Sequence, residues 1–156
     1  RRKSIDTTVD AALGELYRQV PGSRDLVGRA QGILVFPSVL EAGCIVGASR
    51  GDGALRVGGK TVSYHATTSG SFGLLAGAQS TAVFLLFMTK DALTNFQNSR
   101  GWTVGADASV TLLTVGASAQ MTSATAQQPV IGYVLSNRGL MAGISIDGAR
   151  VTTLNL

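Results

Sequence analysis

Apolar residues near the start of the chain recur every three or four positions, the spacing of one face of a helix. These residues are Ile5, Val9, Leu13, Leu16 and Val20. Pro21 and Gly22 then interrupt the pattern, because proline and glycine end helices. We therefore predict an amphipathic helix over residues 5–20. Ser23 is placed to cap a second, short helix that runs to Gly32.

From residue 32 onward the apolar residues alternate with polar ones or form short runs between glycines, a pattern typical of strands. Strands are expected at residues 33–36, 44–49, 54–57, 61–66, 71–78, 82–88, 103–114, 115–121, 130–135, 141–146 and 150–154. One internal helix is expected after Thr89, which can cap it, through Leu93 and Phe96.

Three local features are expected to delimit these strands. Pro37 should end the first strand, and a turn should lie at residues 51–53. Asp147 and Gly148 form the strongest hairpin signal in the chain, and pairing across them would place Ile144 opposite Val151.

The predicted elements define the fold class. Helices at the start and many short strands indicate an α+β protein with a mainly antiparallel, curled sheet, either a sandwich or a partial barrel, with N-terminal helices and one internal helix. At 156 residues the chain is long enough for one self-sufficient core. We expect a single domain over residues 1–156, with a helical segment at 1–22 and the core at 23–156.

Charge changes this picture in one respect. Only 14% of residues are charged, and 13 Lys and Arg face 9 Asp and Glu, for a net charge of +4. Such a balance favours anionic partners such as phosphate headgroups or acidic proteins. Nucleic acid is not expected, because aromatic residues are few and no RNA-binding motif of the RNP type is present.

The cysteine count and the hydropathy pattern exclude two structural features. Cys44 is the single cysteine, so no intramolecular disulfide can form. No 18-residue stretch is consistently apolar, which argues against a membrane-spanning helix, although the alternation of the strands leaves a small outer-membrane barrel as an alternative.

The sequence contains three patterns that resemble catalytic or ligand motifs, and none is expected to act. Ser49 lies in a G-x-S-x-G pattern, but a turn and a strand follow it instead of a helix, and His65 and Asp52 would have to complete the triad. The segment Gly58-Gly-Lys-Thr61 resembles the end of a phosphate-binding loop without its helix, so a glycine turn between strands is expected. One His and one Cys with scattered carboxylates predict no metal site and no cofactor.

Asp107 is the one carboxylate within an uncharged stretch. A half-buried carboxylate needs a cation or several donors, so we expect a structural pair, with an arginine such as Arg138 as the partner. A direct role in ligand binding is the alternative for Asp107.

The arginines are the strongest candidates for binding. Arg18, Arg24 and Arg29 lie in the helical part, and Arg50 and Arg138 in expected turns, where side chains reach solvent. A guanidinium beside glycine N–H groups can hold a phosphate. We therefore expect these five residues to bind anionic lipid.

Seven motifs occur in an order that resembles the SYLF lipid-binding domain family, which includes fungal actin-binding proteins. They are Ala30-Gln-Gly-Ile-Leu-Val-Phe-Pro37, Leu40-Glu-Ala-Gly43, Gly47-Ala-Ser-Arg-Gly-Asp-Gly53, Gly70-Ser-Phe-Gly73, Gly77-Ala-Gln79, Gly105-Ala-Asp-Ala-Ser-Val110 and Gly139-Leu-Met-Ala-Gly143. The resemblance extends over about residues 26–151. Arg29 and Arg138 stand at positions that are basic in the family.

The resemblance implies a non-enzymatic domain that binds phosphoinositides or other anionic phospholipids, with an N-terminal amphipathic helix that contributes to membrane contact. Some relatives bind actin, and bacterial relatives are commonly exported or lipoprotein-like. We expect a bacterial lipoprotein, periplasmic or anchored to the outer membrane, whose leader precedes Arg1. The alternative is a protein-interaction or structural module of the cell envelope without a specific lipid ligand.

Overall fold

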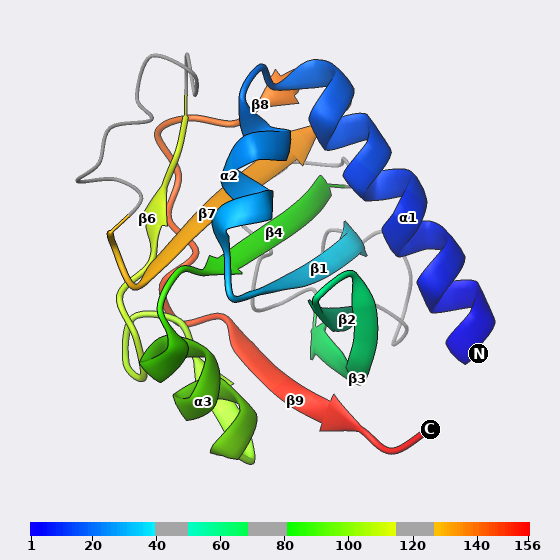
Figure 1. The fold of residues 1–156 in the computed structure, drawn as a ribbon, viewed down its shortest axis with the longest axis vertical. Coiled ribbons are helices and arrows are strands. Elements are labelled where there is room, and N and C mark those ends of the chain that lie inside the picture. Colours follow the sequence, from blue (N-terminus) through cyan, green and yellow to red (C-terminus); the bar gives the residue numbers. More distant parts are fainter. Residues whose placement is uncertain (40–49, 69–80, 115–126) are drawn as a thin grey trace.

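The computed structural model describes residues 1–39, 50–68, 81–114 and 127–156, and it shows an α+β fold (Figure 1). The helices are α1 (Arg2–Gln19), α2 (Ser23–Arg29) and α3 (Lys90–Asn98). The strands are β1 (Gly32–Val39), β2 (Arg50–Val57), β3 (Lys60–Thr68), β4 (Thr81–Phe87), β5 (Gly101–Thr103), β6 (Thr111–Leu112), β7 (Val130–Ser136), β8 (Gly139–Leu140) and β9 (Arg150–Leu154).

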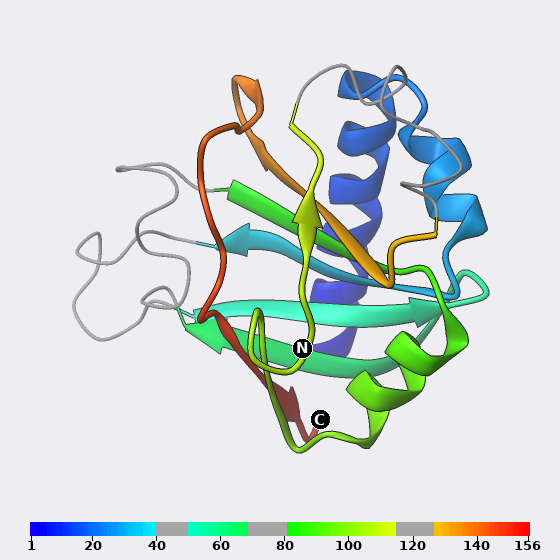
Figure 2. The ribbon, with the colours of Figure 1, turned by 90° about the vertical axis from the view of Figure 1, so that its left-hand side faces the viewer.

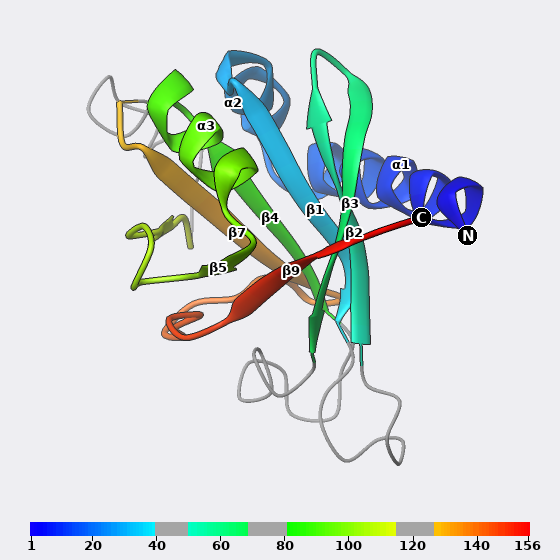
Figure 3. The same cartoon turned by 90° about the horizontal axis from the view of Figure 1, so that it is seen from below.

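The nine strands of the described residues form one sheet in the order β5-β9-β3-β2-β1-β4-β7-β6, with β8 paired to β7. The pairs are antiparallel except β6 with β7. Viewed from below, the sheet curls so that β9 and β5 turn back beneath β4 and β7 (Figure 3). The predicted class, α+β with a curled, mainly antiparallel sheet, N-terminal helices and one internal helix, is confirmed, and the curl is that of a half-barrel.

The convex face of the sheet is covered by α1 and α2 (Figure 3). Alternate residues of β1, β4 and β7 point to this side and pack against the apolar stripe of the two helices. The buried members on the helices are Ile5, Val9, Leu16, Val20 and Leu26. The stripe predicted from periodicity is therefore packed on the sheet, and Leu13 is its one half-buried member.

The concave face encloses the second core. Strand residues of the opposite parity meet α3, β5 and β9 there, and aromatic rings fill the space. Phe96 stacks on Phe87 with ring centroids 4.9 Å apart, and Trp102 meets both rings edge-on. Such pairs add to the stabilisation from burial alone.

Hydrogen bonds and ion pairs fix α1 to the β2–β3 hairpin. Asp6 accepts hydrogen bonds from the hydroxyls of Thr61 at 2.8 Å and Tyr64 at 2.9 Å. Arg1 forms an ion pair with Asp52 at 2.7 Å. The two ends of the chain lie on the same side of the molecule (Figure 2).

Several local predictions are confirmed. The Thr89 hydroxyl accepts a hydrogen bond from the Ala92 N–H and so caps α3. Gly58 and Gly59 both have positive φ angles, of 62° and 79°, and form the tight turn between β2 and β3. The segment resembling a phosphate loop is thus a hairpin turn.

The predicted turn at residues 51–53 is wrong, because these residues belong to β2 and pair with β3. Gly53 is required by packing, since a Cβ there would lie 2.3 Å from the Val35 carbonyl oxygen and 2.6 Å from the Phe36 ring. Pro37 does not end β1 either. The strand continues to Val39 across an irregularity in its pairing with β4, a place where a residue without an N–H is tolerated.

Three further expectations are corrected. Ser23 does not cap α2, because its buried hydroxyl donates instead to the Leu16 carbonyl at 3.1 Å and joins α2 to α1. The segment 103–114 is not one strand, because only Thr103 and Thr111–Leu112 belong to strands and residues 105–107 form a turn. Residues 141–146 form no strand, so Val151 pairs with Trp102 and Thr67 and not with Ile144. The strands expected at 44–49, 71–78 and 115–121, with Cys44 and Ser49, lie outside the described residues.

Candidate functional site

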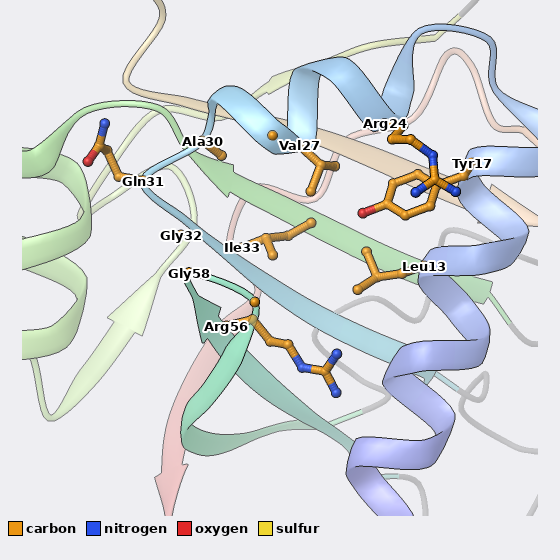
Figure 4. Close-up of a pocket in the computed structure, with 12 residues that line it drawn as sticks. Leu13, Tyr17, Arg24, Val27, Ala30, Gln31, Gly32, Ile33, Arg56 and Gly58 are labelled. Carbon is orange, nitrogen blue, oxygen red and sulfur yellow. The ribbon is translucent and has the colours of Figure 1, made fainter.

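A cavity of about 500 Å³ lies between α1, α2, the start of β1 and the β2–β3 turn (Figure 4). Its apolar wall is formed by Leu13, Val27 and Ile33, one from each of α1, α2 and β1. Two guanidinium groups, of Arg24 and Arg56, border it on opposite sides in Figure 4. The cavity therefore combines an apolar wall with two cations, the composition expected of a site for a small ligand.

Arg24 projects from the first turn of α2 and is exposed. Its guanidinium lies over the Tyr17 ring, 4.3 Å from the centroid. This cation–π contact holds the planar group by its face, so the five N–H donors at its edge stay available to a ligand. Among the described residues no carboxylate forms an ion pair with Arg24.

Arg56 enters the cavity from β2 and is held firmly. It forms an ion pair with Asp10 of α1, donates to the Thr61 hydroxyl at 3.1 Å and to the Asp6 carbonyl at 3.1 Å. Its side chain is only 12% exposed. These contacts use three of its five donors and place the charge at a fixed point.

Tyr17 stands between the two arginines, and in Figure 4 its hydroxyl points into the cavity. Burial raises the pKa of Tyr17, while the nearby charges of Arg24 and Arg56 act in the opposite direction. The phenol therefore stays protonated near neutral pH and can donate a hydrogen bond to an anion.

The five arginines selected from the sequence do not all converge. Arg18 is paired with Glu15 on α1, which lowers the pKa of that carboxyl, and Arg29 is paired with Asp25 at 3.2 Å. Both pairs are exposed, so they contribute little to stability and can exchange partners.

Arg138 lies in the β7–β8 turn at the same end of the molecule as the end of α1 (Figure 1), but the turn is separated from α2 in Figure 2. Arg50 begins β2 and is not in a turn, and its side chain lies outside the described residues. Of the four whose side chains the structure describes, only Arg24 lines the cavity.

Sequence reasoning missed Arg56, because a lone arginine between Leu55 and Val57 reads as part of a strand. A usable signal was present on α1, where Asp6 and Asp10 stand four residues apart and therefore on one face of the helix. Paired acids of that kind on a helix that packs against a sheet call for a basic partner.

The predicted partnership of Asp107 with Arg138 is wrong. The Asp107 carboxylate accepts a hydrogen bond at 2.6 Å from the backbone N–H of Thr103, and its own N–H donates to the Thr103 carbonyl. Asp107 is exposed and closes a local turn, which requires no cation.

His65 is a buried residue of β3 whose ring forms hydrogen bonds. Its Nε2 lies 2.7 Å from the Ser63 hydroxyl, and its ring packs 4.9 Å from that of Phe96. Burial lowers the pKa of His65 to about 4, although a hydrogen bond with the Thr152 backbone opposes the shift. Such an imidazole is a weak base, so the Ser63–His65 pair is poorly suited to general-base chemistry near neutral pH.

Two other kinds of feature are absent from the described ranges 1–39, 50–68, 81–114 and 127–156. No cluster of three or more His, Cys, Asp or Glu residues is suited to a metal ion. No helix there has the length and apolar character needed to cross a membrane.

The fold places the chain among α+β proteins built on a curled, mainly antiparallel half-barrel. The family model Ysc84, described as Las17-binding protein actin regulator, matches residues 68–155, which is more than half of the chain. The chain belongs to this family, and the SYLF resemblance inferred from its motifs is confirmed. No curated protein matches the chain. The cavity is built entirely from residues before the matched segment.

Proposed function

We propose that this domain is a non-enzymatic module that binds anionic phospholipid headgroups, with Arg24 as its principal cation. Membership in the SYLF family is consistent with a lipid-binding or actin-linked module. The observation that carries the proposal is the exposed guanidinium of Arg24, held over Tyr17 beside a cavity and free of a described carboxylate partner.

Two further cations lie on elements that border the cavity. Arg29 follows it on α2, and its pairing with Asp25 is an exposed contact that a phosphate can displace. Lys60 follows the β2–β3 turn, whose glycines line the cavity. Each cation close to an anionic bilayer contributes about 1 kcal/mol, so a few of them give a salt-sensitive affinity.

Headgroups that carry more phosphate should bind more tightly, which makes phosphoinositide-like lipids the favoured ligands. We also propose that the protein is a bacterial exported lipoprotein, as expected from the sequence. It would then be periplasmic or anchored to the outer membrane. Determination of the full-length N-terminus tests this proposal, because an export signal that ends in a lipidated cysteine would fix the compartment.

A second candidate rests on the family description, which names binding to a protein, Las17. In that case the same arginines contact an acidic segment of a protein partner, and lipid contact is incidental. Pull-downs from a native extract with and without detergent separate the two, because a protein partner remains bound when the lipids are dissolved.

Vesicle co-sedimentation tests the lipid proposal. We expect binding to phosphatidylcholine vesicles that contain phosphatidylinositol phosphate, and little binding to phosphatidylcholine alone. Arg24→Gln should weaken binding about fivefold, the effect of losing one cation near the surface. Arg100→Gln is the matched control, because Arg100 is exposed, precedes β5 and does not line the cavity.

Equal recovery with neutral and anionic vesicles at low salt would reject the lipid proposal. Equal losses in the Arg24 and Arg100 variants would show that net charge alone acts, and would remove the assigned site.

A further inference from the structure

The cavity beside Arg24 is larger than a single phosphate group requires. Its volume of about 500 Å³ falls within the range of pockets that enclose small molecules, about 300–1,000 Å³. A headgroup phosphate alone would contact the rim and leave the apolar wall of Leu13, Val27 and Ile33 unfilled.

Two different chemistries are within reach of one occupant. Leu13 and Val27 are only half-buried, so apolar surface remains to be covered. The guanidiniums of Arg24 and Arg56 and the Tyr17 hydroxyl border the same space (Figure 4). An anion with an adjoining apolar group satisfies both, whereas a free inorganic anion or an uncharged lipid satisfies one.

Each cation has a distinct place in this arrangement. Arg24 is exposed and keeps its edge donors available, so it can form a bidentate pair with a phosphate. Arg56 lines the opposite side in a fixed position, held by Asp10, Thr61 and the Asp6 carbonyl, and its charge is balanced by Asp10.

We propose that this cavity binds one molecule of an anionic phospholipid, with its phosphate at Arg24 and Tyr17 and the first part of its acyl chain against Leu13, Val27 and Ile33. This inference rests on the proposed function and deepens it. The proposed function requires only that the protein contact a charged lipid surface, whereas here the protein encloses a single lipid molecule. The apolar wall then determines affinity together with the charge.

Calorimetric titration with dihexanoyl phosphatidic acid, used below its micelle concentration, tests the proposal without a bilayer. We expect saturable binding of one lipid per chain. Dihexanoyl phosphatidylcholine, with the same acyl chains and no net charge, should bind at least about tenfold more weakly, and inorganic phosphate also at least about tenfold more weakly.

The decisive variant fills the cavity. Val27→Trp places a large ring against the apolar wall and should weaken phosphatidic acid binding at least about tenfold. Val62→Trp is the matched control, since Val62 is 51% exposed on β3 and does not line the cavity. If circular dichroism shows that Val27→Trp does not fold, Arg24→Gln serves instead. It should weaken phosphatidic acid binding by a larger factor than phosphatidylcholine binding, because choline balances the phosphate charge of phosphatidylcholine.

Each contrary outcome has a separate meaning. If anionic vesicles bind but short-chain phosphatidic acid does not, or if Val27→Trp binds it normally, the enclosed lipid is rejected and the surface proposal stands. If inorganic phosphate binds as tightly as phosphatidic acid, the apolar contact is rejected. If neither vesicles nor soluble lipid bind, both proposals fail.

Discussion

The two faces of the sheet bury apolar residues in different ways. On the concave face, Phe87, Phe96 and Trp102 interlock with strand side chains beneath α3. On the convex face, α1 packs closely but α2 leaves a cavity beside it, bordered by two arginines. Both faces bury a core, but the convex face leaves a part of its packing open to a ligand.

The difference follows from how each cover is attached. The concave core is closed by strands β5 and β9, which are hydrogen-bonded into the sheet. The convex cover is helical, and its last part is the short helix α2, joined to α1 through the Ser23 hydroxyl and apolar contacts. A helix of seven residues does not reach the β2–β3 turn, which lies at the ends of these strands, so the space between α2 and the turn stays open.

Replacing one leucine on each face with alanine should give the largest difference in the free energy of unfolding. Leu85→Ala on the concave face should lower the free energy of unfolding by about 2–5 kcal/mol, because the side chain is fully buried and its loss leaves a void. Leu13→Ala at the cavity should lower it by about 1 kcal/mol, because Leu13 is half-buried and already borders open space. Urea denaturation measures both, and equal losses would contradict the comparison.

The free energy of unfolding should also depend on pH through His65, which packs against Phe96 in the concave core. The folded pKa of His65 is about 4, below the ordinary value of 6.5, so the unfolded chain takes up a proton first as the pH falls. Stability is therefore full above pH 6.5 and should fall by about 2 kcal/mol between pH 7 and pH 5. Urea denaturation at several pH values measures this loss.

His65 is the single histidine of the chain, so the variant test is direct. His65→Gln should flatten the dependence between pH 7 and pH 5, since it removes the titrating ring. An unchanged slope in that variant would assign the loss to other groups and would overturn the assignment to His65.

The smallest expected effects lie on the helices of the convex face. Gly14 in α1 and Gly28 in α2 both have open space where a Cβ would stand. Gly14→Ala and Gly28→Ala should each raise the free energy of unfolding by about 0.5–1 kcal/mol, because alanine favours the helix. Thermal unfolding measures the change, and a loss of stability in either variant would mean that its helix packs more tightly than the structure indicates.

Local sequence patterns predicted much of this fold, because spacing and capping act over a few residues. The stripe from Ile5 to Val20, the Thr89 cap and the Gly58-Gly59 turn are of this kind. Features set by distant contacts were mispredicted. Gly53 looked like a turn residue, but the distant ring of Phe36 requires a glycine there. Asp147 and Gly148 form a local turn, but β9 pairs with β3 and β5 and not across that turn.

The sequence predicted the charge of the ligand but not the full set of residues that line the cavity. Net charge and exposed arginines indicated an anionic ligand, and Arg24 was among the residues selected. Sequence alone could not reveal that Arg56, remote from Arg24 along the chain, reaches the same cavity. Nor could it show that Asp6 and Asp10 hold the β2–β3 hairpin against α1, because that contact exists only after the sheet has formed.

The central claim is that the two faces differ in ligand binding, and a titration followed by amide NMR tests it most directly. On addition of dihexanoyl phosphatidic acid, the N–H signals of Gly28, Gly32, Gly58 and Gly59, which line the cavity, should shift and saturate together. The signals of α3 and β5 should stay in place. Shifts confined to α3 and β5, with the cavity glycines unmoved, would contradict the account.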